Sequence, residues 1–552
     1  MVRSRLHVTK KTPLAARGLV TAEHHLGADV GAQILARGGN AVDAAVATAF
    51  AMTVVEPFMS TIAGAGTMLI HLAKRDETVV LDFNGNAPLR AHETMYRLIG
   101  GIATHALFAW PQVEDDANVF GHRSVAVPGS VKGLALALER YGTMTLADAI
   151  APAVKLAREG VEADWYLSLM HAKYLEELLA FPESARVYLR NGRFVHRPPA
   201  LDPGDRATFP DLARSLELIG RDGPDAFYRG AIADAIVDEM SRGGGLIGKE
   251  DLAAYEVRVL PPLRGKYRGL DVAFSPGATG GITALEILNI LGQYPSDRAG
   301  WNTVEGLDHR GRAARRAFLD RFEEIGDPQF VKVDWERLAS AAYAKEVVAG
   351  FKRGGASRAR RSESRRAEDC TTHVCAVDRQ RNMVALTHTA VSLFGSRVVA
   401  RDTGILLNNG MIWFDPEPGK ANSIAPGKRG MVNMVPALAF RRGEPYLTVG
   451  APGGRKIVSA IPQVIANVAD GTGTLQQAIE APRVHDEGGQ LEVDDRVGDA
   501  ALEALRKRGH DVLPRHETYS TLRFSRPIGI RVTPKGLEAG LDALGAAAAA
   551  GR

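Results

Sequence analysis

The chain has little of what would indicate an exported, disulfide-stabilised or membrane-spanning protein. Its 552 residues include only two cysteines, Cys370 and Cys375. Because they lie in a segment with an extended pattern, their side chains would be far apart on opposite faces, and we expect no disulfide between them. No run of about 18 apolar residues occurs, so no membrane-spanning helix is expected. The basic N-terminal segment has no apolar stretch behind it, and we therefore expect a cytoplasmic protein without a secretory signal.

The chain also lacks a strong charge of one sign. It has 68 Lys and Arg residues against 64 Asp and Glu residues, a net charge of +4, so no broad basic face and no nucleic-acid partner is expected. The histidines at 24–25, His309 and His373 show no metal-ligand spacing, and two cysteines are too few for a typical zinc site. We expect neither metal nor cofactor, and we interpret these histidines as bonded core or surface residues. Asp320 and Arg321, adjacent on a predicted helix, are interpreted as a structural charge pair.

Helical and β-type patterns both occur along the chain. Residues 26–37 have helical apolar spacing, and Asn40 can cap a second helix at 41–54. That second helix is apolar on nearly every face, which predicts burial on most sides. A low-complexity tail at 546–551 is expected to be frayed.

The sharpest change in composition lies at about 352–370. This segment is rich in arginine and serine and has almost no apolar residues. We expect a mobile basic linker that separates two functional parts, residues 1–370 and 371–552. A basic segment that binds a partner is the alternative interpretation.

Thr371 follows this linker directly and opens a β-rich segment, which suggests a specific chemistry. If the chain is cut between Cys370 and Thr371, Thr371 gains a free α-amine beside its hydroxyl. An α-amino group has a pKa of about 7.7–8.0, so it can accept the hydroxyl proton near neutral pH. One residue would then supply nucleophile and general base and would form an acyl-enzyme. We therefore predict a self-cleaving amide hydrolase or acyltransferase.

A second threonine is predicted to lie beside the first. The segment after Thr371 has the pattern of a hairpin of two strands with a turn at 378–382. If the turn is centred on Gln380, Thr389 lies opposite Thr371, and directly opposed side chains come within about 5 Å. The Thr389 hydroxyl would then orient the Thr371 oxygen. A slip of one residue would turn Thr389 to the other face, so the prediction depends on the register.

A glycine-rich loop, GAPGG at 450–454, follows one predicted strand and precedes a predicted helix. Free backbone amides at a helix N-terminus can stabilise the oxyanion of acyl transfer, and glycine lets the backbone approach very closely. The loop is therefore a candidate oxyanion hole. An ordinary strand–helix turn is the alternative, whereas a nucleotide phosphate loop is disfavoured because the Gly-Lys-Ser/Thr ending is missing.

Short motifs along nearly the whole chain match, in order, those of one known family. They are GGNAVDAA at 38–45, VEP at 55–57, MS at 59–60, VPGS at 127–130, YGTM at 141–144, GDP at 326–328, TTH at 371–373, FGS at 394–396, GILLNN at 404–409, KR at 428–429 and PGG at 452–454. So many motifs in one order are highly specific. The chain resembles the γ-glutamyltransferases of the N-terminal-nucleophile hydrolase superfamily.

The resemblance implies an α+β fold, a four-layer αββα sandwich with two sheets between helical layers. It also implies a precursor that cuts itself between Cys370 and Thr371 into a large and a small subunit, which remain together as a heterodimer. By the same resemblance Thr371 is the nucleophile, Thr389 is the supporting threonine, and Gly453 and Gly454 form the oxyanion hole. The other partner would be a small amide or peptide-like substrate.

The sequence departs from the family where typical members bind the charged head group of a γ-glutamyl substrate. Asn84 stands in place of the arginine that holds the α-carboxylate, and Trp413 in place of the Asp that binds the α-amino group. Val391 replaces an Asn, and Val432-Asn433 replaces a Ser-Ser pair. Burying a zwitterionic head group without charged partners costs on the order of several kcal/mol. We therefore expect glutathione to be a poor substrate and a larger or less charged acyl group to be preferred, as in acylase-like members.

Two other functions remain as alternatives. The chain is a genuine γ-glutamyl hydrolase or transferase if Arg429, Arg455 or Lys456 supplies the missing charge. From another class, it is an unprocessed, inactive relative that serves as a binding protein. Retention of Thr371, Thr389 and the two glycines argues against this last interpretation.

Overall fold

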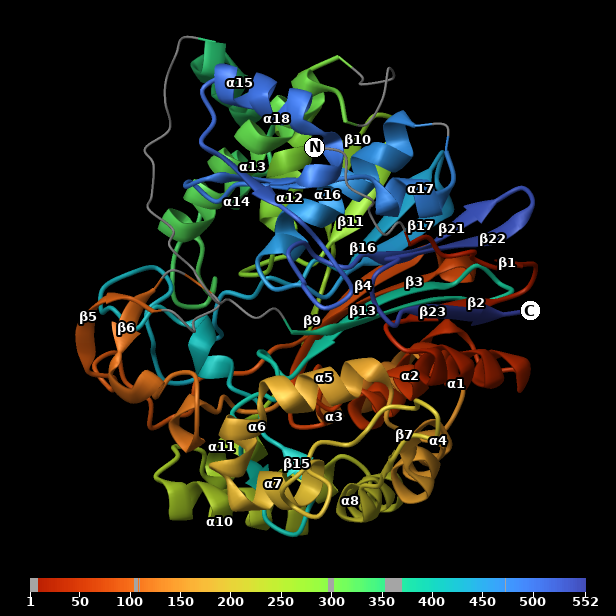
Figure 1. The fold of residues 1–552 in the computed structure, drawn as a ribbon, viewed down its shortest axis with the longest axis vertical. Helices are drawn as coiled ribbons and strands as arrows, with labels where there is room; N and C mark the ends of the chain where they lie inside the picture. The colour runs from red at the N-terminus through yellow and green to blue at the C-terminus, as the bar shows by residue number, and fades with distance from the viewer. Residues whose placement is uncertain (1–7, 104–107, 109, 296–301, 353–369, 472) are drawn as a thin grey trace.

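The computed structural model of the chain describes residues 8–103, 108, 110–295, 302–352, 370–471 and 473–552. The predicted basic linker lies outside these residues, apart from its two end positions. The chain forms two stacked β-sheets enclosed by two layers of helices (Figure 1). This is the four-layer αββα sandwich that the resemblance implied, and the predicted fold class is confirmed.

Within the described ranges each sheet has seven antiparallel strands and takes strands from both sides of the 370–371 junction. Sheet I contains, in spatial order, β23 (Ala548–Gly551), β2 (Leu19–Ala22), β12 (Thr372–Val377), β13 (Met383–Thr389), β3 (Ala65–Leu72), β4 (Glu77–Phe83) and β9 (Arg258–Leu260). Sheet II contains β1 (Leu14–Ala15), β22 (Gly536–Leu541), β21 (Ile528–Thr533), β17 (Glu444–Gly450), β16 (Ala437–Arg441), β11 (Leu270–Phe274) and β10 (Leu263–Tyr267).

Smaller ladders lie outside the sandwich. They are β5 (Leu98–Ile102) with β6 (Pro111–Val113), β7 (Val161–Glu162) with β8 (Arg206–Ala207), β14 (Val399–Ala400) with β15 (Ile405–Leu406), and β18 (Val484–His485) with β19 (Leu491–Asp494) and β20 (Val512–Arg515).

Helices cover the outer face of each sheet (Figure 1). On the side of sheet I lie α1 (His25–Ala36), α2 (Ala41–Val55), α3 (Ser130–Tyr141), α4 (Leu146–Glu159), α5 (Trp165–Lys173), α6 (Leu175–Leu179), α7 (Pro182–Tyr188), α8 (Pro210–Asp222), α9 (Asp225–Tyr228), α10 (Ala231–Gly243) and α11 (Lys249–Ala254). On the side of sheet II lie α12 (Gly281–Leu291), α13 (Val304–Glu324), α14 (Trp335–Leu338), α15 (Ala341–Lys352), α16 (Lys456–Asp470), α17 (Leu475–Glu480) and α18 (Asp499–Lys507).

Helix α2 packs against the middle of sheet I, and its sequence explains why. Asn40 accepts hydrogen bonds from the backbone N–H groups of Val42 and Asp43, while the Asp43 carboxylate accepts from the Asn40 N–H, so the first turn has a complete capping box. Every residue of the helix is buried. The predicted cap and the predicted burial on most sides are both confirmed.

The C-terminal tail is ordered, and the prediction of a frayed end is wrong. Ala548–Gly551 forms β23, which pairs with β2 and extends sheet I at its edge. The backbone N–H of Arg17 donates to the Arg552 carbonyl at 2.7 Å, so even the last residue is bonded. Composition alone suggested disorder, but the unpaired edge of β2 supplies main-chain partners that need no particular side chain.

Both cysteines are buried and free. Within the ranges that the structure covers, no helix is long and apolar enough to cross a membrane. The same residues contain no cluster of three His, Cys, Asp or Glu side chains that would hold a metal ion.

Candidate active site

Thr371 immediately precedes β12 and is almost fully buried, with 5% of its surface exposed. In the β12–β13 hairpin Thr372 pairs with His388, so Thr371 stands opposite Thr389. The Thr371 hydroxyl donates to the Thr389 hydroxyl oxygen at 3.1 Å. The predicted register of this hairpin is therefore confirmed, and it brings the two threonines into contact.

Thr389 is held from a second direction. The backbone N–H of Val391 donates to the Thr389 hydroxyl oxygen at 2.8 Å. With two donors on this oxygen, the direction of the Thr371 hydroxyl is restrained by a partner that is itself restrained. Thr389 is 1% exposed, so water does not compete for these bonds.

The backbone at this position is strained. Thr371 has a φ of 128° and Val391 a φ of 89°. Both are β-branched residues, for which positive φ is a genuine outlier that costs on the order of 1–3 kcal/mol. Such strain persists only where the surrounding structure holds it. Here it falls on Thr371 itself and on Val391, whose N–H bonds to Thr389.

Cys370, the residue before Thr371, is anchored by the turn that follows α2. Its thiol contacts the carbonyl oxygens of Phe58 and Met59 at 3.3 and 3.0 Å. Burial raises the pKa of the Cys370 thiol to about 12, so it stays neutral near pH 7 and does not compete as a nucleophile. The side chain thus fixes the bond that precedes Thr371.

The glycine-rich loop follows β17 and leads into α16. Gly453 has a φ of 132° and Gly454 a φ of 53°. A Cβ on Gly453 would lie 2.5 Å from Cα of Ser525, so glycine is required both by conformation and by space. Neither glycine amide donates a hydrogen bond to any acceptor in the part of the chain that the structure describes. The loop therefore presents two free N–H groups beside a helix N-terminus.

The loop and Thr371 lie at the same end of the sandwich. The His373 ring packs against Gly450, the last residue of β17, where an added Cβ would be 2.1 Å from the ring. The end of β17 therefore lies over the start of β12. His373 itself is fully buried, its Nδ1 lies 2.9 Å from the Thr387 hydroxyl, and burial lowers its pKa to about 3. It is a neutral core residue, as predicted.

The residues predicted to shape the acyl pocket converge beside the two threonines. Val391 and Trp413 belong to one buried apolar cluster together with Ala65 and Val432. Ala65 is the cross-strand neighbour of Thr389 in the β3–β13 ladder. The cluster therefore adjoins the Thr371–Thr389 contact and offers an apolar wall.

Asn84 contacts the same strand, β3. Its amide donates to the Asp82 carboxylate at 2.7 Å and to the Thr67 hydroxyl at 3.2 Å. Thr67 is two residues from Ala65 on β3 and so shares its face of the sheet. Asn84 is 3% exposed, and its side-chain oxygen has no hydrogen-bond partner within the described ranges.

The three cations considered as substitute handles are all engaged elsewhere. Arg429 pairs with Asp82 at 2.7 Å. The other two pairs are Arg455 with Glu487 at 3.0 Å and Lys456 with Glu492 at 3.0 Å. Binding a substrate carboxylate through any of them would require breaking an ion pair that is largely buried.

The predicted charge pair between Asp320 and Arg321 is wrong. Asp320 pairs with Arg316, one helical turn earlier, and accepts a hydrogen bond from the Tyr343 hydroxyl at 2.7 Å. Adjacent residues on a helix point in different directions, whereas residues four apart face each other, and this spacing was the signal available in the sequence. Arg321 instead points at Asn433, a contact that no local pattern indicated.

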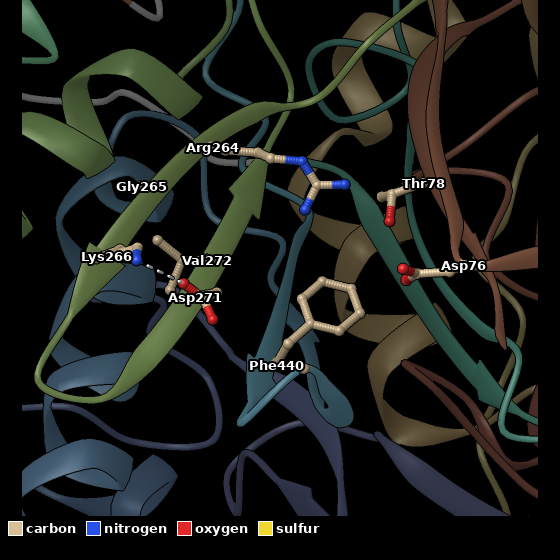
Figure 2. Close-up of a pocket in the computed structure, with 9 residues that line it drawn as sticks. Asp76, Thr78, Arg264, Gly265, Lys266, Asp271, Val272 and Phe440 are labelled. Atoms are coloured by element: carbon tan, nitrogen blue, oxygen red, sulfur yellow. Dashed lines mark ion pairs between the residues drawn. The ribbon is translucent and has the colours of Figure 1, made fainter.

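A separate hollow lies at the opposite end of the strands, around the β3–β4, β10–β11 and β16–β17 turns (Figure 2). It has a volume of about 490 Å³ and is lined by charged groups that include Asp76, Arg264, Lys266 and Asp271. It holds none of the predicted site residues. The predicted chemistry therefore gathers at one end of the sandwich only.

Comparison with known proteins assigns this arrangement to a family. The sequence model described as gamma-glutamyltranspeptidase matches residues 27–552. The chain belongs to the γ-glutamyltranspeptidase family. It is 39% identical over 505 residues to acylase ACY 1 proenzyme of Pseudomonas sp. (strain SE83), covering 91% of this chain and 88% of that protein. It is 35% identical over 527 residues to glutathione hydrolase proenzyme of Escherichia coli (strain K12), covering 92% and 88%.

Solved structures of the family have the same fold. A cephalosporin acylase from Bacillus halodurans matches with a TM-score of 0.85 and 27% identity, covering 100% of this chain and 98% of that one. The γ-glutamyltranspeptidase of Helicobacter pylori matches with a TM-score of 0.55 and 31% identity over 65% of this chain and 96% of that one. The chain is thus an enzyme of the N-terminal-nucleophile hydrolase type, with acylase-like or glutathione-hydrolase-like activity.

Proposed function

We propose that this family member is a self-processing amidase in which Thr371 becomes the N-terminal nucleophile. The observation that carries the proposal is the buried, strained Thr371 whose hydroxyl donates to Thr389 at 3.1 Å. A cut before Thr371 divides the chain into a large subunit, 1–370, and a small one, 371–552, that remain together. The relatives named as proenzymes support such processing.

Processing begins with an attack of the Thr371 oxygen on the carbonyl carbon of Cys370. The C–N bond between the two residues breaks, the hydroxyl proton passes to the Thr371 nitrogen, and an ester links Cys370 to the Thr371 oxygen. Water then hydrolyses the ester, which leaves a carboxylate on Cys370 and restores the hydroxyl of Thr371 beside a free amine. Relief of the strained φ of Thr371 favours this cut.

In the processed enzyme the α-amine of Thr371 takes the hydroxyl proton as the oxygen attacks a substrate amide. The free N–H groups of Gly453 and Gly454 stabilise the oxyanion that forms, and the leaving amine takes the proton. Water or an acceptor amine resolves the resulting threonyl ester. Thr389 acts on the orientation of the nucleophile rather than on the proton.

The pocket favours an acyl group less charged than γ-glutamyl, and glutathione is a poor substrate. Asn84 and Trp413 offer no charge, and the cations Arg429, Arg455 and Lys456 are held in ion pairs. The similarity to two proteins named as acylases supports this acylase-type specificity. A genuine glutathione hydrolase remains the second candidate because the Escherichia coli relative carries that name.

Processing is tested by a denaturing gel with N-terminal sequencing of purified protein. We expect two fragments, the smaller starting at Thr371, from the wild type and from Thr371→Ser, which keeps a hydroxyl. Thr371→Ala should remain one chain and lose at least about a thousandfold in turnover. A wild-type chain that stays intact and shows no turnover would contradict the proposal and favour the inactive binding protein. A Thr371→Ala variant that keeps its activity would also contradict the proposal, because another residue would then be the nucleophile.

Specificity is tested with γ-glutamyl, glutaryl and pentanoyl nitroanilides. The first carries an amine and a carboxylate, the second only the carboxylate, and the third neither. We expect the kcat/KM of the γ-glutamyl compound to be no higher than that of the glutaryl compound. A γ-glutamyl preference of orders of magnitude would identify the glutathione-hydrolase alternative instead.

A further inference from the structure

Arg321 is a fully buried cation on α13 that has only neutral partners. Its guanidinium donates to the carbonyl oxygen of Thr279 at 2.8 Å, to that of Val432 at 2.6 Å and to the side-chain oxygen of Asn433 at 3.1 Å. Its exposed fraction is 0%. No carboxylate lies within ion-pairing distance of it in the described part of the chain.

Two other arginines with little exposed surface each have a carboxylate partner. Arg429 pairs with Asp82, and Arg258 pairs with Asp327 at 2.9 Å. A buried charge without a counter-charge is costly, and burial lowers the pKa of Arg321 to about 9. At neutral pH the guanidinium still carries its charge. The fold therefore keeps an uncompensated cation beside Asn433, which suggests that its counter-charge comes from outside the chain.

Asn433 links the Arg321 guanidinium to the residues predicted to shape the acyl pocket. Because Arg321 has only donors, the oxygen of the Asn433 amide must face it, and the NH2 group is the free end. That NH2 group is buried without a hydrogen-bond partner among the described residues, as is Nε of Arg321. Val432, the preceding residue, belongs to the apolar cluster of Val391 and Trp413. Next to this apolar cluster the chain thus combines an unpaired donor, the NH2 group of Asn433, with the buried positive charge of Arg321.

We propose that Arg321 is a specificity-determining positioning residue that, through Asn433, selects acyl chains whose far end carries a hydrogen-bond acceptor, and an anionic acceptor above all. The inference rests on the proposed function, because it places the acyl group of the substrate beside Thr371. A terminal carboxylate would satisfy the free NH2 group and provide the counter-charge that the fold omits. A terminal amide would satisfy only the hydrogen bond, and a terminal methyl neither.

The experiment compares glutaryl, 4-carbamoylbutanoyl and pentanoyl nitroanilides, which differ only in the terminal group. We expect the wild-type kcat/KM to fall in that order, with glutaryl about tenfold above pentanoyl. In Arg321→Gln the glutaryl preference should shrink to within about threefold, chiefly through a higher KM for the glutaryl substrate. Arg321→Lys, which keeps the charge, should retain most of the preference.

Two further variants separate this role from a structural one. Arg310→Gln removes another buried arginine of α13, one that donates to Asn467 at 2.8 Å, and should leave the glutaryl preference as it is. Asn433→Asp supplies the missing counter-charge from within the chain and should abolish the preference while Arg321 stays in place. Because Asp and Asn have nearly the same shape, Asn433→Asp remains a valid test if Arg321→Gln fails to fold.

A wild-type enzyme that is indifferent to the terminal group, or an Arg321→Gln or Asn433→Asp enzyme that keeps the wild-type ratio, would overturn the inference. In that case turnover that still disappears in Thr371→Ala leaves the proposed function intact. If instead the wild type is neither processed nor active on any of the three anilides, the proposed function fails, and the inference fails with it.

Discussion

The two ends of the sandwich differ in backbone conformation and in the burial of their polar groups. At the end that carries Thr371, β-branched residues hold positive φ angles, and polar atoms of Asn84 and Asn433 are buried without partners. At the opposite end, around the hollow of Figure 2, Arg442 and Gly443 both hold a positive φ in an exposed turn, and the side chains of Lys266 and Asp271 are 89% and 48% exposed. Strained β-branched residues and buried unpartnered polar groups are thus found where acyl transfer is proposed, whereas the other end has exposed left-handed turns without β-branched residues.

The largest contrast between the two ends is expected from Gly453→Ala. The substitution forces a Cβ to within 2.5 Å of Ser525 and disfavours the φ of 132°, so the amides of the loop must move. We expect a loss of about 100- to 1,000-fold in kcat, the usual cost of a disturbed oxyanion donor.

Gly443→Ala is the matched control, because Gly443 has a φ of 82° but nothing within 4 Å of an added Cβ. It should cost about 1 kcal/mol of stability and leave kcat unaltered. Equal losses of kcat in both variants would contradict the contrast. If Gly453→Ala does not fold, Gly454→Ala at a φ of 53° gives the milder version of the same test.

Glu56 lies in the turn that anchors Cys370. Its raised pKa predicts that the stability of the protein depends on pH through this end of the sandwich, the end that carries Thr371. Burial, aided by Asp164 and opposed by His24 and Arg526, raises its pKa from 4.5 to about 7. The folded state thus binds the proton more tightly than the unfolded state, so this group lowers the free energy of unfolding as the pH rises from about 4.5 to 7. Glu56→Gln removes this dependence, and its stability relative to wild type should improve by up to about 3 kcal/mol from pH 4 to pH 8.

Denaturant unfolding at several pH values measures this effect. Glu77→Gln is the control at the other end, where 45% of the side chain is exposed, and it should change stability by less than about 0.5 kcal/mol at any of these pH values. A Glu56→Gln profile parallel to that of the wild type would show that Glu56 ionises without cost in its turn.

Trp413→Asp tests the apolar wall of the pocket. A carboxylate there offers a partner to the α-amine of a γ-glutamyl group and none to a glutaryl group, so the ratio of their kcat/KM values should rise about tenfold. Trp165→Asp, at a position 37% exposed on α5, should leave the ratio as in the wild type. A fall in both activities with no change in the ratio would show that Trp413 shapes the fold rather than the specificity.

The smallest effect is expected at the end of the sandwich opposite Thr371, beside the hollow. Lys266 and Asp271 lie 3.9 Å apart with 89% and 48% of their side chains exposed. Such pairs contribute little, so Lys266→Ala should change the free energy of unfolding by less than about 0.5 kcal/mol and leave kcat/KM at the wild-type value. A measurable loss of activity would assign the hollow a part in catalysis.

Features set by local chemistry were predictable from the sequence. The capping box of Asn40 and the Thr371–Thr389 register depend on spacing along a few residues, and both are present. The ordered tail depends on the edge of β2 at the other end of the chain, and the position of Arg321 depends on partners 42 to 112 residues away. The Ala-Ala-Ala-Gly sequence of 548–551 has no strand pattern and does not indicate that β2 offers a free edge. The roles of the site residues follow from the resemblance more than from any pattern, because side chains from six segments meet at one end.

The order of strands in sheet I places β2, from the first part of the chain, between β23 and β12 from the second. Sheet II likewise sets β10 and β11 beside β16. Cleavage after residue 370 would therefore yield two polypeptides whose strands are hydrogen-bonded to each other in both sheets. Their separation would demand loss of the whole architecture, so partner exchange between differently tagged molecules should proceed no faster than global unfolding.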